Sequence, residues 1–439
     1  MFRCLSDIVH KDAKQFAIYT VEDRAIPNMI DGLKPVQRFV LYNALRKGKG
    51  DYKKFRKVAD LGGSVAELGY HHGETNAQDA GALMASTWNN NLSILEGDGS
   101  FGSRLVKKAG AARYVFARIH ENFFKIFKDF DCCPAHKDNE HIPPAFYLPI
   151  IPMVLVNGVE GIATGYATDI LPHDPNDVVE CTKLALEGKL DRDPVVKFPS
   201  FYGDVLERDD DKRGVIVRGT YEMTGKTKMV ITEIPLKYDR EKYIDVLDDL
   251  QDKDKIVSYN DRCRDGKARF EITLKRDYAN KATPELIIKD FKLEQKVSEN
   301  IVVIDDKGLV RTYESSKDLI NDFVKIRLGY IDQRIELMKE KTRVAIGNAS
   351  AKVLFIQKVI SGEIVLHGKK RAEAKKEIES FPELKEHVDL LLAMPLYSIT
   401  TDEMEKLQKE VDKLAKEHDH WLKTNSTKEY KKDLKECVI

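Results

Sequence analysis

The spacing of apolar residues divides the chain into three stretches. In the first, Val36, Phe39, Val40 and Ala44 recur at helical spacing directly after a turn rich in Gly and Pro at residues 31–35. This pattern predicts helices that begin at turns. We therefore expect a compact, mainly helical domain over residues 1–145.

The pattern changes to short, strand-like runs over residues 146–300. Residues 214–221 and 228–235 are rich in β-branched and aromatic side chains, which are typical of strands. Residues 243–250 have helical spacing instead. We expect a separate α/β domain here, and an α+β multidomain fold for the whole chain.

Over residues 301–439 the apolar residues recur in steps of three and four. The first series comprises Leu319, Phe323, Ile326 and Tyr330, and the second comprises Met404, Leu407, Val411, Leu414, His418 and Trp421. Such series are typical of helices in a coiled coil, but both could equally pack on the body of the protein. Glycines and prolines interrupt the helical pattern between the two series. We expect an antiparallel arm with a small globular tip at about residues 355–400.

Composition favours a folded protein without a membrane role. Hydrophobic residues make up 42% of the chain and charged residues 33%, and no apolar run reaches the ~18 residues that a membrane span needs. Residues 1–7 lack the apolar core of a signal peptide, and the six cysteines form no CxxC pair. We expect a cytoplasmic protein of about two to four domains.

Charge is locally uneven although 72 basic and 72 acidic residues cancel. One run has a single acid and seven basic residues: Arg46, Lys47, Lys49, Lys53, Lys54, Arg56 and Lys57. A second cluster comprises Arg104, Lys107, Lys108, Arg113 and Arg118. A single run of this kind is more often a solvated loop, but two runs together indicate a surface that contacts phosphates.

Tyr114 is a candidate nucleophile. A tyrosine can form a reversible ester with phosphate, but a phenol is protonated at neutral pH and needs a base or metal nearby and cations to hold the developing charge. Arg113 beside it could bind phosphate oxygens with two hydrogen bonds. By itself an Arg-Tyr pair is weak evidence in a chain with 17 tyrosines.

Two further motifs carry less chemistry. His71 and His72 are adjacent and the other histidines have no complementary spacing, so we expect no metal site in this chain. An imidazole that donates to a phosphate is the functional interpretation, and a histidine bound to local backbone is the alternative. The turn 97–103 is rich in glycine but lacks the Lys-Ser/Thr of a nucleotide-binding loop, so no ATP site is expected.

Taken together and in this order, the motifs resemble those of the DNA-cleaving subunits of type IIA DNA topoisomerases. The motifs are Arg24–Pro27, Asp31–Arg38, Gly62–Glu67, His71–Glu74, Gly97–Ser103 and Ala112–Tyr114, followed by Pro149–Gly158, Glu160–Gly165 and Ile231–Pro235. The resemblance covers about residues 20–300 in motifs and the rest of the chain in layout.

The resemblance implies roles for individual residues. Tyr114 is expected to join a DNA 5′ end covalently, while Arg113, Arg24, Lys34 and His72 hold the scissile phosphate. Arg38 and the basic run from Arg46 to Lys57 are expected to grip the duplex through phosphates. Ile162 resembles a wedge that enters the base stack, although an isoleucine beside glycine is otherwise an ordinary core residue. Thr75 and Asp79 match positions that face cleavage-stabilising drugs in bacterial relatives, where the first is usually serine.

The resemblance also implies architecture and partners. We expect a winged-helix DNA-binding domain over 1–145, an α/β tower over 146–300, and a long antiparallel coiled-coil arm with a helical dimer gate over 301–439. Two copies would cut both strands of duplex DNA. Neither the ATPase nor the Toprim domain of the family is recognisable, so Mg²⁺ and ATP are expected on separate large subunits. Without a DNA-wrapping propeller, we expect relaxation and decatenation but no negative supercoiling. Some members of the family are encoded by phages and would act in the host cytoplasm.

Three rival interpretations are open at this point. The chain could be a non-catalytic DNA-binding or architectural protein with the same fold. It could be another tyrosine-using DNA enzyme, such as a site-specific recombinase, although the separate Arg, His and Arg partners of that class are not evident. A structural coiled-coil protein would leave the basic clusters without a role.

Overall fold

The computed structural model describes residues 9, 13–208, 210 and 212–437, so the start of the chain at 1–7 lies outside the described residues. The chain forms two compact units: a large unit of residues 1–327 and 433–439, and a small unit of residues 328–432. The fold is mixed α/β. Within the described ranges, no helix is both long and apolar enough to cross a membrane.

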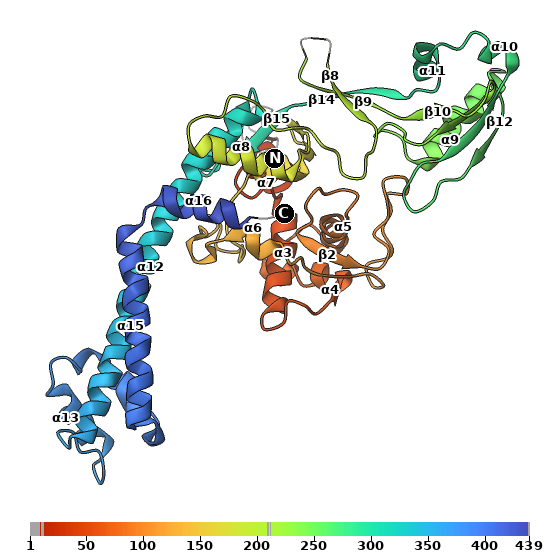
Figure 1. The fold of residues 1–439 in the computed structure, drawn as a ribbon. Helices are drawn as coiled ribbons and strands as arrows, with labels where there is room; N and C mark the ends of the chain where they lie inside the picture. The colour runs from red at the N-terminus through yellow and green to blue at the C-terminus, as the bar shows by residue number, and fades with distance from the viewer. Residues whose placement is uncertain (1–8, 10–12, 209, 211, 438–439) are drawn as a thin grey trace, which may run out of the picture. The chain divides into compact units, whose positions relative to one another are not determined.

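Three helices form the first part of the large unit: α3 (Pro35–Gly48), α4 (Val58–Gly63) and α5 (Glu74–Ala85) (Figure 1). α3 begins where the sequence predicts, because Pro35 fits the first helical position and the amide of Lys34 is capped by Gln37 Oε1 at 2.9 Å. A short helix α2 (Lys14–Thr20) and a π-helical turn η2 (Val21–Ala25) precede it. The antiparallel sheet β1-β3-β2 packs against α3 and α5. Its strands are β1 (Arg56–Lys57), β3 (Phe116–Ile119) and β2 (Leu95–Asp98).

Further elements of the large unit lie between α4 and α5 and along residues 123–186. They are η3 (Ala66–Leu68), α6 (Phe123–Ile126), β4 (Phe127–Lys128), η4 (Phe130–Cys132), β5 (Leu148–Pro149), α7 (Met153–Asn157) and α8 (Pro175–Leu186). β4 pairs with β5. The hairpin of β6 (Val159–Ile162) and β7 (Ala167–Ile170) follows α7.

Two antiparallel sheets lie in the stretch expected to be α/β. The four-stranded sheet has the order β10-β11-β13-β12, and the three-stranded sheet has the order β14-β9-β8. Their strands are β8 (Asp204–Glu207), β9 (Gly214–Arg218), β10 (Tyr221–Met223), β11 (Lys228–Ile231), β12 (Ile256–Asp261), β13 (Phe270–Leu274) and β14 (Glu294–Ser298). The helices are α9 (Arg240–Asp252), α10 (Arg276–Ala279) and α11 (Pro284–Asp290). The predicted run 214–221 is divided between two sheets, while the predicted helix 243–250 lies inside α9.

One loop ties the first part of the large unit to the four-stranded sheet. Leu105 is buried in the hydrophobic core of that sheet, and its carbonyl accepts the amide of Arg240 at 3.1 Å. Arg104 is buried in an ion pair with Glu233. Burial raises the pKa of Glu233, and the positive charge of Arg104 opposes that rise. Residues 1–145 and 146–300 therefore share one compact unit, and the division at residue 145 stays a prediction.

The last strands lead into the longest helix. β15 (Ile301–Ile304) pairs with β16 (Val310–Tyr313), and α12 (Ser316–Ile360) follows. Leu319 and Phe323, from the first predicted series, are fully buried within the large unit. Arg327 is fully buried too, where it binds the carboxylate of Asp129 and the carbonyl of Pro149. The first series thus packs on the body at these positions, as the alternative interpretation allowed.

The small unit consists of helices. They are the later part of α12, α13 (Arg371–Glu379), η5 (Lys385–His387), α14 (Val388–Leu392), η6 (Leu396–Ser398), α15 (Thr401–Lys423) and part of α16 (Ser426–Glu436). The tip has its own core, which includes Phe355, Ile378 and Leu391.

α12 and α15 lie side by side in the small unit (Figure 1). All six predicted seam positions of α15 are buried or half-buried, and Leu407 is the most buried of them. His418 of this series contacts α12 directly, because its Nδ1 lies 2.8 Å from Thr342 Oγ1. The spacing of the second series therefore predicted the contact face of α15.

A buried ion pair fixes the loop before α3. Arg38 donates to the Asp31 carboxylate at 2.8 and 3.1 Å, and the same carboxylate accepts the amides of Leu33 and Tyr147 at 3.0 Å each. Gly32, at φ +69°, lies so close to α7 that an added Cβ would be 2.5 Å from the amide nitrogen of Val154. The pair therefore joins the loop, α3 and the segment before β5.

We predict that Arg38→Met lowers the free energy of unfolding by about 3–5 kcal/mol, because it leaves the fully buried Asp31 charge without its cation. Urea denaturation followed by circular dichroism measures the change. The matched control is Arg46→Met, since Arg46 and Glu67 form an exposed pair at 3.4 Å and such pairs contribute about 0–1 kcal/mol. Equal losses in the two variants would contradict the assignment.

Candidate nucleic-acid cleavage site

Tyr114 lies on an exposed but firmly anchored turn. Its side chain is 74% exposed, and its phenol forms no hydrogen bond or ring contact with any described residue. The backbone around it is held at both ends of the turn: Ala112 O accepts from Ala59 N at 2.9 Å and Val115 O accepts from Val58 N at 3.0 Å. Val115 is buried. The turn therefore presents the phenol, and the exposed Arg113 beside it, toward solvent from a fixed base.

His72 and Arg24 both lie near Tyr70. The ring of His72 lies against Tyr70 at a centroid distance of 5.3 Å and against Tyr19 of α2 at 5.5 Å. Burial raises the pKa of Tyr70, and the charge of Arg24 opposes that rise. Arg24 therefore lies within electrostatic reach of the Tyr70 phenol. His71 points elsewhere, with its Nε2 3.8 Å from Glu140 Oε2.

The two adjacent histidines have different neighbours, Glu140 for His71 and Tyr70 for His72. Among the residues that the structure describes, no group of three or more His, Cys, Asp and Glu side chains is arranged to hold a metal ion.

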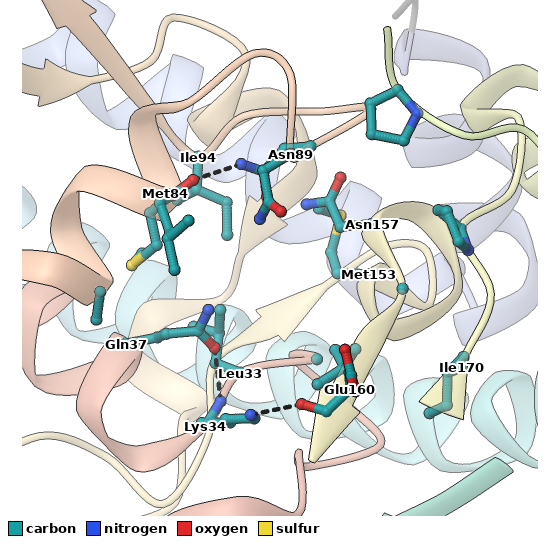
Figure 2. A pocket seen from close by; sticks show the side chains of 18 of the residues that line it. Leu33, Lys34, Gln37, Met84, Asn89, Ile94, Met153, Asn157, Glu160 and Ile170 are labelled. Carbon is teal, nitrogen blue, oxygen red and sulfur yellow. Dashed lines mark hydrogen bonds between the residues drawn. The ribbon is translucent and has the colours of Figure 1, made fainter. Parts of the chain in front are cut away.

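Lys34 lies beside the β6–β7 hairpin. Its ammonium donates to the carbonyl oxygen of Glu160 at 2.7 Å, as Figure 2 shows. Burial lowers the pKa of Lys34, and the negative charge of Glu160 opposes that shift. Because an anion close by would favour the charged form, a phosphate beside Lys34 would raise this pKa again.

The same hairpin carries Ile162 and contacts the Arg24 segment. Ile162 ends β6 and is 81% exposed, so it is not an ordinary core residue. Gly161 packs against the backbone of Ala25, since an added Cβ would lie 2.2 Å from the Ala25 carbonyl oxygen. The hairpin therefore places Arg24, Lys34 and Ile162 on segments in direct contact.

Thr75 and Asp79 are exposed on the first turns of α5. Asp79 and Lys34 line one open hollow of about 650 Å³, whose walls include Met153, Glu160 and Ile170 (Figure 2). Thr75 is not among the residues that line this hollow. The hollow therefore connects the start of α5 with the β6–β7 hairpin.

The structure corrects the expectation for Arg38. Its side chain is buried and occupied by Asp31 and by the carbonyl of Leu33, so it is not placed to contact a duplex at the surface. The cause is tertiary: Asp31 is fully buried, and a buried carboxylate needs a charged partner.

The basic run from Arg46 to Lys57 divides into two groups. Lys47 binds Asp60 and Ser64, Arg46 reaches Glu67 at 3.4 Å, and Arg56 donates to the carbonyl of Lys47. The other four are exposed and form no ion pair with any described residue: Lys49, Lys53, Lys54 and Lys57. The surface that remains open to an anion is therefore smaller than the sequence indicated.

The second basic cluster divides in the same way. Arg104 is buried with Glu233, and Arg118 pairs with Glu96 and lies over the ring of Phe55 at 4.5 Å. Lys107, Lys108 and Arg113 remain exposed. Sequence reasoning missed Tyr19, because 53 residues separate it from His72 and no spacing rule links them.

Comparison with known proteins gives one consistent result. A family model described as DNA gyrase/topoisomerase IV (A subunit) matches residues 24–436. The chain is 48% identical to the DNA topoisomerase medium subunit of Enterobacteria phage T4 over 99% of its own length and 98% of that protein. It is 31% identical to DNA topoisomerase 2 of Arabidopsis thaliana over 92% of its length, but it spans only 28% of that protein.

A solved structure agrees. The crystal structure of the Plasmodium falciparum topoisomerase II DNA-binding, cleavage and re-ligation domain matches with a TM-score of 0.90 and 27% identity. The match covers 98% of this chain and 63% of that one.

We predict that Gly161→Ala disturbs the contact between the hairpin and the Arg24 segment, since its new methyl group would overlap the Ala25 carbonyl oxygen. The expected loss is about 1–3 kcal/mol, with faster amide exchange over residues 13–26. Thermal melting and hydrogen exchange measure both effects. Gly225→Ala is the control, because its nearest neighbour would be Lys228 Cβ at 3.7 Å. Unchanged exchange in Gly161→Ala would contradict the contact.

Proposed function

The chain belongs to the DNA gyrase/topoisomerase IV A-subunit family, as the DNA-cleaving subunit of a type II DNA topoisomerase, and we propose that Tyr114 is its nucleophile. The observation that carries this proposal is the pairing of an exposed phenol with a rigid base: the side chain is open to a large substrate, while the backbone on both sides is fixed. A buried or mobile tyrosine would not suit attack on a duplex.

The proposed chemistry is a transesterification. The Tyr114 hydroxyl gives up its proton and its oxygen attacks phosphorus, so that a bond to the 5′ phosphate of the DNA forms, the bond from phosphorus to the 3′ oxygen breaks, and the 3′ oxygen takes up a proton. Arg113, Arg24, Lys34 and His72 would hold the phosphate oxygens, because guanidinium, ammonium and imidazole groups are donors that stabilise developing negative charge. The reverse reaction reseals the strand without an external energy source. Two chains, as a homodimer, would cut both strands of one duplex.

Other subunits would supply the metal ion and the nucleotide. We propose that Mg²⁺ and ATP are held by a separate Toprim and ATPase subunit. The name of the phage T4 relative, a medium subunit, is consistent with a multi-subunit enzyme. Relaxation and decatenation, without negative supercoiling, are the expected activities.

The architecture supports the finer assignments. We propose that α3 to α5 with the β1-β3-β2 sheet form a winged-helix domain, that residues 146–300 form the tower, and that α12 and α15 form a coiled-coil arm with a dimer gate at its tip. Ile162 would be the wedge at the bend of the duplex, which its exposure at the end of β6 favours. Thr75 and Asp79 are proposed to face cleavage-stabilising drugs, which their exposed positions on α5 permit.

We predict that Tyr114→Phe abolishes the covalent protein–DNA adduct and leaves DNA affinity unchanged, because only the reacting oxygen is removed. The complex with its large subunits and Mg²⁺ is mixed with DNA, denatured, and examined for protein-linked DNA. If the variant still binds DNA, it is folded, and the loss of the adduct is due to the missing hydroxyl. If the unmodified complex forms no adduct, the rival interpretation of a non-catalytic DNA-binding protein is preferred.

We predict that replacing Lys53, Lys54 and Lys57 by Ala weakens DNA binding at all sequences alike. The plot of log binding constant against log salt concentration has a negative slope. Its magnitude should decrease by about 0.9 for each phosphate that the variant no longer neutralises. Fluorescence anisotropy over a salt series measures it. Lys47→Ala is the control and should change the slope little, because Lys47 already binds Asp60 and Ser64. A larger effect in the control than in the triple variant would show that this surface does not contact DNA.

A further inference from the structure

The imidazole of His72 lies between two tyrosines. The Tyr19 hydroxyl hydrogen-bonds the ring, closest to Nε2 and 3.3 Å from Nδ1, and the two rings are tilted by 36°. Tyr70 meets the same imidazole edge-on at 65°. Within the described ranges, Tyr19 is the side chain that hydrogen-bonds this ring.

One hydrogen bond holds the backbone of His72, and one cation acts on the neighbouring Tyr70. The carbonyl oxygen of His72 accepts from Asn76 Nδ2 at 2.8 Å, which holds its backbone. Tyr70 is buried on one side and feels the charge of Arg24. The rings that contact the imidazole are therefore two phenols, and the charge of Arg24 acts on one of them, Tyr70.

Tyr19 is not needed there to fill a core. Its neighbours on α2, Phe16 and Ile18, are 60% and 46% exposed, and Tyr19 itself is 37% exposed. A helix of seven residues that buries so little is not stabilised by its apolar side chains. Tyr19 differs from Phe16 and Ile18 because its hydroxyl hydrogen-bonds His72.

A hydroxyl in this position has a chemical consequence. A neutral imidazole has one nitrogen that donates and one that accepts, and the hydrogen bond to one nitrogen sets the state of the other. If the Tyr19 hydroxyl donates to Nε2, the ring proton must be on Nδ1. That N–H is then available to a second acceptor, such as a phosphate oxygen.

We propose that Tyr19 is a positioning residue for His72, whose hydroxyl fixes the ring orientation and the nitrogen that carries the proton, so that the imidazole donates to the scissile phosphate. This inference rests on the proposed function of His72. Tyr19 lies before residue 24, where the match to the family model begins, so the family match does not include it.

The test uses the complex of the full chain with its large subunits and Mg²⁺, and compares Tyr19→Phe, His72→Ala and the double variant. Tyr19→Phe keeps the ring and removes only the hydroxyl. Its cleavage rate on a saturating duplex should fall roughly 10-fold, the size expected when one hydrogen bond is removed. Its Kd for the duplex and its melting temperature should not change. In the His72→Ala background the same substitution should have no further effect. Phe16→Ala, on the same helix, is the control and should cleave at the unmodified rate.

Two results would overturn the inference while the proposed function stands. One is an unmodified complex that forms the adduct together with a Tyr19→Phe variant that cleaves at the same rate. The other is a double variant whose fold-loss in cleavage rate equals the product of the two single losses. That result would show that Tyr19 acts independently of His72. An unmodified complex that forms no adduct would overturn the proposed function itself, and this inference with it.

Discussion

The buried ion pair of Asp31 and Arg38 is the constraint on which the candidate site depends. One carboxylate accepts two hydrogen bonds from the Arg38 guanidinium and two from backbone amides, one of them more than a hundred residues away in the sequence. Lys34 lies inside the loop that these bonds close, and the Arg24 segment leads directly into it. A charge in the core costs several kcal/mol unless it is paired, so the loop has one stable arrangement. Lys34, one of the groups proposed to hold the phosphate, inherits its position from that arrangement.

Tyr114, the proposed nucleophile, lies on a different segment of the fold from Arg24 and Lys34. Tyr114 and Arg113 stand on a turn that is bonded to the start of α4, whereas Arg24, Lys34 and Ile162 lie where η2, the loop before α3 and the β6–β7 hairpin meet. In both places the backbone is fixed and the functional side chains are open. Such an arrangement suits a large, stiff substrate that approaches from outside.

Local patterns predicted much of the fold and part of the site. The start of α3, the helix α9 and the contact face of α15 follow from spacing and capping, which act between residues a few positions apart. Whether an arginine is buried or exposed does not follow from such local patterns. Arg38 and Arg46 are eight positions apart on one helix, yet one is buried with Asp31 and the other is exposed, because burial depends on segments that only the tertiary fold brings near. The contact of Tyr19 with His72, and the division of the run 214–221 between two sheets, depend on tertiary structure in the same way. The role of Tyr114 as a nucleophile is still a prediction from motifs, which its exposure supports.

The central claim is that a phenol oxygen of this chain becomes linked to DNA. The most direct measurement traps the complex of the chain, its large subunits, Mg²⁺ and DNA in denaturant, digests both polymers, and identifies the modified peptide by mass spectrometry. We expect a peptide that carries a nucleotide on Tyr114 through its 5′ phosphate. A nucleotide on any other residue, or one attached through a 3′ phosphate, would contradict it.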